Sequence, residues 1–249
     1  MNSFEKITLE EMESVKLMDR TDTKFSFRYN QLETILNEMQ HSYKIVEIKS
    51  KRICSYETLY FDTASLKLYH DHHSGRLNRY KVRKRKYIDS GISFLEVKLK
   101  NNKGRTIKQR VKEKGTPSDF EITSKEFLIK ELPFDPQILS PVVWVNYERV
   151  TLVNKNGPER VTIDINLNFI QGSKIFRYDQ LVIAEVKQSK RSRSPFISCM
   201  KLHHIKEGSI SKYCMAVAAT HSTVKINNFK EKFNSLKKIT SYDIIASHC

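Results

Sequence analysis

Residues 79–87 read Arg79-Tyr80-Lys81-Val82-Arg83-Lys84-Arg85-Lys86-Tyr87. Successive side chains on a β-strand point to opposite faces. A strand here would place basic side chains on one face, namely Arg79, Lys81, Arg83 and Arg85. The opposite face would begin with Tyr80 and Val82, and we expect Lys84 and Lys86 beyond them to lie in solvent. The pattern therefore predicts a strand with one strongly basic face.

Five other stretches repeat this design, with an apolar face opposite a face of ionisable groups: 20–27, 94–100, 106–112, 160–168 and 182–187. In 94–100, for example, Glu96 and Lys98 alternate with apolar residues. In 160–168 the predicted apolar face holds Val161, Ile163, Ile165 and Leu167. About six strands of one kind indicate a protein built mainly from antiparallel sheet.

The distribution of charge separates two arrangements of these strands. An antiparallel sheet with its polar face in water is the ordinary alternative. However, residues 76–114 contain 15 basic side chains and only three acidic ones. Like charges on neighbouring strands repel, so such a face is expected where it binds an anion. We therefore predict an α+β fold, a closed antiparallel β-barrel tunnel with a basic lumen, flanked by helices that cover its apolar outer face.

The formal net charge of +16 over 249 residues calls for an anionic partner. Nucleic acid, an anionic membrane surface and a small polyanion are the candidates. The basic residues alternate with apolar ones along strands, and no nucleic-acid-binding motif is present. A small polyanion is the favoured partner, and we expect no specific nucleic acid.

Cellular location is indicated only indirectly. Four scattered cysteines without metal-ligand spacing favour a reducing compartment. The first 20 residues contain no apolar signal region, and no window approaches 18 apolar residues. We expect a cytoplasmic protein without a membrane span.

Helices are predicted at a few places. Capping patterns at Asn30 and Thr123 each precede an apolar helical face, and Ser211–Thr220 forms a third helical stretch. His70, His72 and His73 are expected to lie in a loop rather than at a metal site. One domain is expected over residues 1–221, with a polar helix or loose tail over 222–249.

From about Met18 to about Ala219 the chain resembles the VTC domain, the polyphosphate polymerase domain of the vacuolar transporter chaperone complex and its bacterial relatives. That family has the triphosphate tunnel metalloenzyme, or CYTH-like, fold. The resemblance rests on motifs in a fixed order: Arg20-Thr-Asp-Thr-Lys24-Phe25, Tyr60-Phe61-Asp62, Lys81-Val-Arg83-Lys-Arg85-Lys-Tyr87, Phe94-Leu-Glu96-Val-Lys98, Tyr147-Glu-Arg149, Arg160-Val-Thr-Ile-Asp164, Ala184-Glu185-Val-Lys187 and Ser211-Lys212-Tyr213.

The resemblance implies a set of tunnel residues. The catalytic basic residues would be Arg83, Arg85, Lys98, Arg149 and Arg160. Further phosphate-binding residues would be Lys24, Lys81, Lys108, Arg110, Lys187 and Lys212, with Lys108 and Arg110 as alternatives for one position of the family. The metal ligand would be Glu185, with Glu96 and Asp164 as second choices. Oxygen ligands together with phosphate oxygens suit Mg²⁺ or Mn²⁺.

Three functions are consistent with these residues. The first is a metal-dependent polyphosphate polymerase, a phosphotransferase that moves the γ-phosphate of ATP to a growing polyphosphate chain. The second is a tripolyphosphatase or nucleoside triphosphatase of the same fold, which would favour paired Glu-x-Glu strands. The strand over 94–98 contains one acid, Glu96, followed by Lys98, and this basic bias favours the polymerase. The third is a non-catalytic polyanion-binding module. The oligomeric state is left open.

Overall fold

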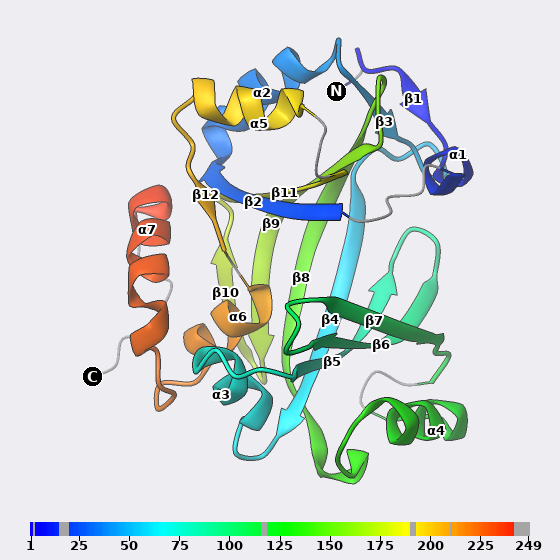
Figure 1. The fold of residues 1–249 in the computed structure, drawn as a ribbon, viewed down its shortest axis with the longest axis vertical. Helices are drawn as coiled ribbons and strands as arrows, with labels where there is room; N and C mark the ends of the chain where they lie inside the picture. Colours follow the sequence, from blue (N-terminus) through cyan, green and yellow to red (C-terminus); the bar gives the residue numbers. More distant parts are fainter. Residues whose placement is uncertain (2, 15–19, 116–118, 190–192, 210, 242–249) are drawn as a thin grey trace.

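The computed structural model describes residues 1, 3–14, 20–115, 119–189, 193–209 and 211–241. It shows an α+β fold with one 12-stranded sheet (Figure 1). Its main path is β12 (Glu207–Gly208), β2 (Arg20–Arg28), β11 (Leu181–Ser189), β9 (Glu159–Gln171), β8 (Leu139–Asn154), β4 (Cys54–Thr63), β5 (Arg79–Tyr87), β6 (Ile92–Lys100) and β7 (Thr106–Lys112).

Neighbouring strands on this path are antiparallel. Two shorter strands extend it: β3 (Tyr43–Val46) pairs with β8, and β10 (Lys174–Tyr178) pairs with β9. The one parallel pair among the described strands joins β3 to β1 (Lys6–Ile7). The six predicted strands are thus present, as parts of a larger sheet.

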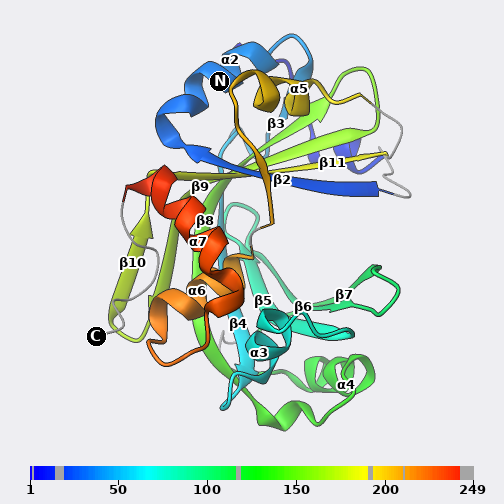
Figure 2. The ribbon, with the colours of Figure 1, turned by 60° about the vertical axis from the view of Figure 1, so that its left-hand side comes forward.

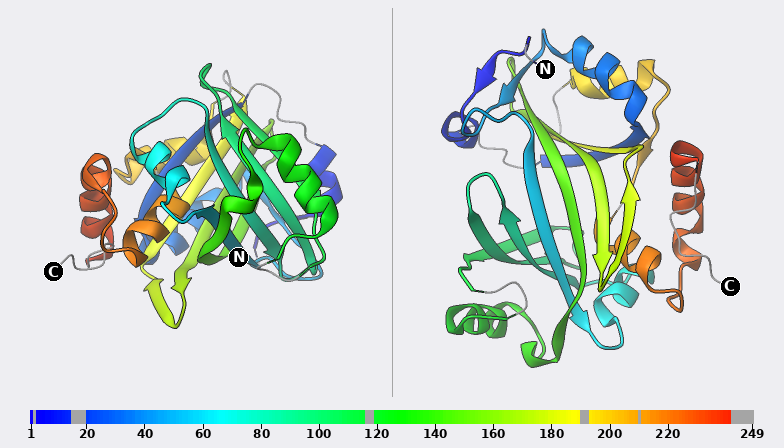
Figure 3. Two further views of the ribbon diagram at one scale, coloured as in Figure 1. Left: turned by 90° about the horizontal axis from the view of Figure 1, so that it is seen from below. Right: turned by 180° about the vertical axis from the view of Figure 1, so that it is seen from behind.

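The prediction of a closed barrel is wrong for the described residues. The path ends at β12 on one side and β7 on the other, and these edges do not pair. The sheet bends into two arms, the first formed by β2 and β11 and the second by β5, β6 and β7, joined by the long strands β4, β8 and β9 (Figures 1 and 3). The edge strand β12 is only two residues long, so it offers few backbone groups that could pair with β7 and close the sheet.

Helices cover the apolar outer faces of both arms. On the first arm, α2 (Leu32–Met39) and α5 (Pro195–Leu202) pack over buried strand residues such as Phe25, Ile163 and Ala184. On the second arm, Leu128 of α4 (Ile122–Glu131) packs against Val82. None of the described helices is long and apolar enough to cross a membrane.

The inner face of the sheet is partly filled by helices as well. Here α6 (Lys212–Thr220) buries nearly its whole length against β8 and β9, beside α3 (Lys67–His73). From the C-terminal helix α7 (Lys230–Thr240), Phe233 and Leu236 join the same cluster (Figure 2). The remaining short elements are α1 (Leu9–Ser14) and the 3-10 turns η1 (Tyr29–Gln31), η2 (Pro136–Ile138) and η3 (Asn227–Phe229).

The three predicted helices are present, but two of their caps are wrong. Asn30 lies inside η1, where Gln31 Oε1 instead accepts a hydrogen bond from the Arg28 N–H. Thr123 lies inside α4, which follows Glu121 without a side-chain cap. Ser211 does cap α6, since its side chain accepts from the Cys214 N–H. The histidines of 70–73 lie on α3, so their expected loop is also wrong.

A bulge divides β9 into two halves whose side chains pack in different clusters. The pairing with β8 shifts between Asn146 and Glu148, opposite Asn166, whose φ is +52°. Asparagine tolerates this left-handed conformation better than most residues. Beyond the bulge, Leu167 packs with the inner cluster around α6, whereas Ile165 packs with α2 and α5. The prediction that Leu167 shares the face of Ile165 is therefore wrong.

Lys84 and Lys86, on the same face of β5, differ in their exposure to solvent. Lys86 is exposed, as predicted. Lys84 is buried on the outer face beneath α4, and its ammonium lies 3.5 Å from the Glu113 carboxylate. The expectation of solvent at Lys84 is wrong because α4 covers this face, and the buried charge is stabilised by a buried carboxylate.

Truncation of the outer core should destabilise the sheet. Leu95 is fully buried on β6, so Leu95→Ala should lower the free energy of unfolding by about 2–5 kcal/mol. Leu77→Ala, at a side chain that is 62% exposed, should change it by less than about 0.5 kcal/mol. Urea denaturation measures both, and equal effects would contradict the assigned burial.

Candidate functional site

The concave face of the sheet encloses a cavity of about 600 Å³, which we call the main cavity. Both arms line it. Its lining includes twelve of the fourteen side chains predicted from the sequence: Lys24, Lys81, Arg83, Arg85, Lys98, Lys108, Arg110, Arg149, Arg160, Glu185, Lys187 and Lys212. The other two, Glu96 and Asp164, are almost fully buried and contact the lining residues from behind.

Strand register explains why the basic side chains gather in rows. Lys81 on β5 lies opposite Lys98 on β6, which lies opposite Lys108 on β7. Side chains directly opposite one another on antiparallel strands point to the same face. The three lysines therefore form a row across the second arm, and neighbours such as Val82 and Val97 pack on the outer face in the cluster that includes Leu128 of α4.

Glu96 neutralises part of the positive charge on the second arm. Its carboxylate accepts a 2.6 Å hydrogen bond from Arg83 Nε and also forms an ion pair with Lys108. The Glu96 side chain is only 1% exposed, so it binds both cations from the buried side while they line the cavity. The arrangement fixes an arginine and a lysine at a defined separation.

Asp164 repeats the arrangement at the centre of the sheet. Arg149 binds it through two nitrogens, with Nε and Nη2 at 2.5 and 2.9 Å from the two carboxylate oxygens. Lys212, the first residue of α6, donates to the same carboxylate at 2.6 Å. One carboxylate thus holds cations from a strand and from a helix.

Glu185 forms the third such group, on the first arm. Its two oxygens lie 3.0 Å from Lys24 Nζ and 2.6 Å from Lys187 Nζ. The Glu185 side chain is 22% exposed, whereas those of Glu96 and Asp164 are 1% and 4% exposed. Of the three carboxylates, Glu185 is the one open to the cavity.

The cations hold all three carboxyl groups in the charged form. Burial alone would raise the pKa of Glu96, but Arg83, Arg85 and Lys108 outweigh it and lower that pKa to about 2. Arg149 and Lys212 likewise lower the pKa of Asp164 to about 2 against the effect of burial. Lys187 and Lys24 hold the pKa of Glu185 well below its usual range.

Two lysines of the second arm are less firmly protonated. Burial lowers the pKa of Lys98 to about 8, and the nearby charges of Lys81 and Arg83 contribute. Burial also lowers the pKa of Lys108 to about 8, although Glu96 acts in the opposite direction. Burial is the largest cause of both shifts and nearby positive charge adds to it, so an added anion would raise both pKa values.

Three tyrosines shape the cavity, and the sequence analysis did not assign them a role. Tyr56 and Tyr147 stack with ring centroids 5.2 Å apart. The Arg149 guanidinium lies 5.0 and 5.1 Å from these two rings. Tyr60 accepts a 3.0 Å hydrogen bond from Arg83. Tyr60 and Tyr147 each begin one of the quoted motifs, and Tyr147 lies two residues before the assigned Arg149, whereas Tyr56 lies outside these motifs.

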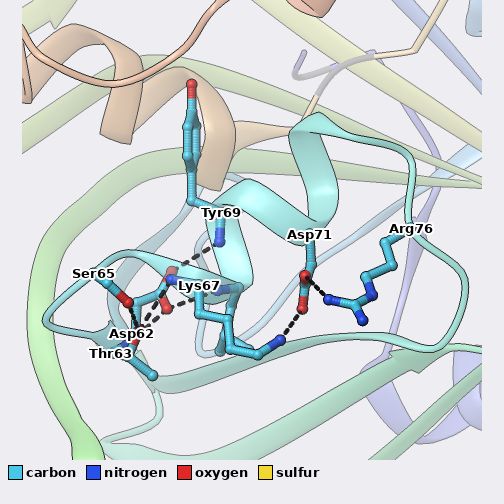
Figure 4. Close-up of polar contacts among 8 residues, drawn as sticks. Asp62, Thr63, Ser65, Lys67, Tyr69, Asp71 and Arg76 are labelled. Carbon is cyan, nitrogen blue, oxygen red and sulfur yellow. Dashed lines mark hydrogen bonds and ion pairs between the residues drawn. The ribbon is translucent and has the colours of Figure 1, made fainter.

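Asp62 fixes the position of α6. This fully buried carboxylate accepts hydrogen bonds from the backbone N–H groups of Leu68 and Tyr69, each at 2.8 Å (Figure 4), and from the Tyr213 hydroxyl. Tyr213 follows Lys212 directly. Asp62 therefore joins β4, α3 and α6, and it positions the helix that carries Lys212.

A second cavity of about 480 Å³ adjoins the main one. Asp22, Lys24, Lys81, Lys98 and Ser211 line both cavities, so the basic surface is continuous from one to the other. Its further lining residues include Arg79, Lys100, His72 of α3 and Lys232 of α7. The concave face thus has room for an extended anion.

The main cavity can hold a divalent cation only if a bound phosphate supplies most of the oxygen ligands. Within the described part of the chain, the one group of three side chains able to hold an ion is Glu38, Cys199 and His203, which do not line the main cavity. Glu185 is a single carboxylate facing basic residues. Mg²⁺ is commonly held by one or two carboxylates and the phosphates of a substrate, and Glu185 suits that arrangement.

The pKa values near 8 predict pH-dependent anion binding. Tripolyphosphate should bind more weakly as the pH rises through 8, because Lys98 and Lys108 lose their protons in the free protein. The loss should reach about tenfold per lysine at pH 9. Calorimetric titration between pH 7.5 and 9.5 measures it. The double variant Lys98→Arg/Lys108→Arg should bind with little pH dependence, and an unchanged profile would contradict the assignment.

The Asp62 contacts predict a large effect on stability. Asp62→Ala should lower the free energy of unfolding by about 3 kcal/mol or more, because buried donors of α3 and α6 lose their acceptor. Asp71 on α3 provides the control, because it pairs with the largely exposed Lys67 and Arg76 (Figure 4). Asp71→Ala should cost less than about 1 kcal/mol. Similar losses in the two variants would argue against a linking role for Asp62.

Comparison with solved structures finds distant similarities. A Bacillus halodurans protein proposed to be an adenylate cyclase is 12% identical, with a TM-score of 0.49 over 85% of this chain and 99% of that chain. A proposed adenylyl cyclase from Hippeastrum, described as having a dominant triphosphatase activity, is 13% identical, with a TM-score of 0.48 over 80% of this chain and 95% of that chain.

Comparison of sequences gives the assignment. No curated protein matches the chain at a significant level. The profile of the VTC domain family matches residues 19–221, which include every cavity residue discussed above except Lys232. The chain therefore belongs to the VTC domain family.

Proposed function

We propose that this protein is a metal-dependent polyphosphate polymerase, which transfers the γ-phosphoryl group of ATP to the end of a polyphosphate chain in the main cavity. The observation that carries the proposal is the continuous basic lining of the two cavities. Cations from both arms and from α6 face one space, which suits a ligand with regularly repeated negative charges. Family membership supports a phosphate substrate.

The arginines would hold the reacting phosphates. Phosphoryl transfer requires mainly positioning and neutralisation of charge on the phosphate oxygens. Arg83 and Arg149 are fixed by buried carboxylates and by tyrosine rings, so their guanidinium groups are oriented before substrate binds. Arg85 and Arg160 would complete the contacts from neighbouring strands. Preoriented donors of this kind lower the barrier without reorganisation during the reaction.

The lysines would guide the phosphate chain. Lys81, Lys98 and Lys108 form a row across the second arm, and Arg110 lies on the same face. Lys24 and Lys187 are paired with Glu185 in the free protein. An incoming phosphate would compete for these two lysines and free the carboxylate. Lys212 would contribute its charge from the start of α6, beside Arg149 on the shared Asp164 carboxylate.

Glu185 would then hold Mg²⁺ or Mn²⁺ together with the phosphate oxygens. When bound, such an ion neutralises phosphate charge and stabilises the leaving group. Glu96 and Asp164 are less suited to this role, because each is almost fully buried behind the lining residues, whereas Glu185 is open to the cavity. Their role would be to orient arginine and lysine.

Transfer to phosphate is favoured over hydrolysis because the main cavity has few side chains that could activate water. The attacking oxygen at the end of a polyphosphate chain is already negatively charged, so it needs no general base. The lining residues of the main cavity, within the described structure, include no histidine and few carboxylates. A triphosphatase, by contrast, must activate water.

Product analysis tests the proposal directly. Purified protein is incubated with ATP and Mn²⁺ or Mg²⁺, the products are separated on a gel that resolves phosphate chains, and free phosphate is assayed in parallel. Long chains with ADP would establish the polymerase. Free phosphate without chains would establish a triphosphatase, and tight tripolyphosphate binding without turnover would establish a binding module.

Glu185→Gln should separate binding from turnover. Metal-dependent turnover should fall about 100-fold or more, because the amide is a poor ligand for the ion. Metal-free tripolyphosphate binding should persist or tighten, since Lys24 and Lys187 lose their competing carboxylate. Glu207→Gln, on the edge strand β12 and exposed, is the matched control and should behave as the unmodified protein. Full activity of Glu185→Gln would rule out its role as metal ligand.

A further inference from the structure

A second cluster of metal-ligating side chains lies on the outer side of the first arm. Glu38 is near the end of α2, Cys199 is on α5, and His203 directly follows α5. These two helices pack side by side on the face of the sheet that is turned away from the main cavity (Figures 1 and 2). None of the three residues lines either cavity or has a role in the proposed reaction.

The three side chains converge on one point. Glu38 Oε2 lies 3.2 Å from Cys199 Sγ, and Glu38 Oε1 lies 2.8 Å from His203 Nε2. One ligand atom from each residue lies within 4.8 Å of the other two. Ligand atoms around one tetrahedral zinc ion are about 3.3–3.6 Å apart. Small side-chain rotations would therefore bring the three atoms to coordination distance.

The exposure of the cluster leaves room for an ion to enter. The Cys199 residue is 5% exposed and lies on the protein side. The His203 and Glu38 side chains are 24% and 36% exposed and reach it from the solvent side. This arrangement provides three protein ligands and an open side for a fourth, water ligand.

We propose that Glu38, Cys199 and His203 form a zinc-binding site that joins α2 to α5. A thiolate and an imidazole select zinc over the hard cations Mg²⁺ and Mn²⁺. Zinc binding would release the Cys199 thiol proton to solvent, and it would require a neutral His203 imidazole whose proton is on Nδ1. The site is separate from the phosphate cavity, and its existence does not depend on the proposed polymerase activity.

The site has a structural consequence for the cavity. The helix α2 follows β2, which carries Lys24, and the segment after α5 runs through β12 to Ser211 and α6, which carries Lys212. An ion between α2 and α5 would tie together the two segments that supply these lysines. Bound zinc should therefore raise the thermal unfolding temperature of the protein, since a ligand that binds only the folded state stabilises it.

Cobalt substitution tests the site through its spectrum. The full chain, reduced and metal-free, is titrated with Co²⁺ in the presence of excess Mg²⁺. We expect one equivalent to give tetrahedral d–d bands and a thiolate-to-cobalt charge-transfer band, both abolished by equimolar Zn²⁺. Cys199→Ser should remove the charge-transfer band and weaken Co²⁺ binding about 100-fold or more, and His203→Asn and Glu38→Gln should each weaken it.

Matched variants exclude other sites. Cys54→Ser removes a different buried thiol, and His204→Asn changes the exposed histidine next to His203. Both should keep the cobalt spectrum and the zinc-induced rise in unfolding temperature, as should Glu185→Gln. A charge-transfer band that survives in Cys199→Ser, or wild-type protein that gives no band at all, would overturn the proposal.

Discussion

A carboxylate shared by two cations is the arrangement on which the concave face of this sheet depends. Rows of lysine and arginine on adjacent strands would repel one another and push the strands apart. Glu96, Asp164 and Glu185 each lie between two of these cations and reduce the repulsion where it is strongest. Burial, together with the remaining excess of positive charge, lowers the pKa of Lys98 and Lys108, and the same excess makes the cavity attractive to a polyanion.

Such buried ion pairs are costly to form, because the charges lose their hydration. Apolar residues of similar size would stabilise the fold as well or better, so stability alone does not account for three of these groups. The apolar outer faces supply the stability instead, through α2 and α5 on the first arm and α4 on the second. This division leaves the inner face available for binding, and α6 and Asp62 then place Lys212 within it.

Much of the fold and the site could be predicted because both follow from alternation along strands. Residues 79–87 and 106–112 form strands with the predicted bounds, and twelve predicted side chains line one cavity. The strand β4 was missed because its second half is buried at every position, and a continuous buried run lacks a period of two. The burial of β8 does alternate, but the unbroken apolar run at residues 142–145 hides that period in the sequence. Lys84 was misplaced because periodicity identifies a face but does not show which helix covers it.

Alternation in the sequence specifies which side chains share a face wherever a strand has no bulge, and the ordered motifs indicate the family. The shared face can be specified in this way because the direction of a side chain on a strand depends only on local backbone geometry. Only the tertiary structure decided that the sheet stays open, that each carboxylate bridges two cations, and that Glu38 meets Cys199 and His203 across two helices. These features join residues far apart in the chain, and their distances depend on bending, bulges and packing that no local pattern contains.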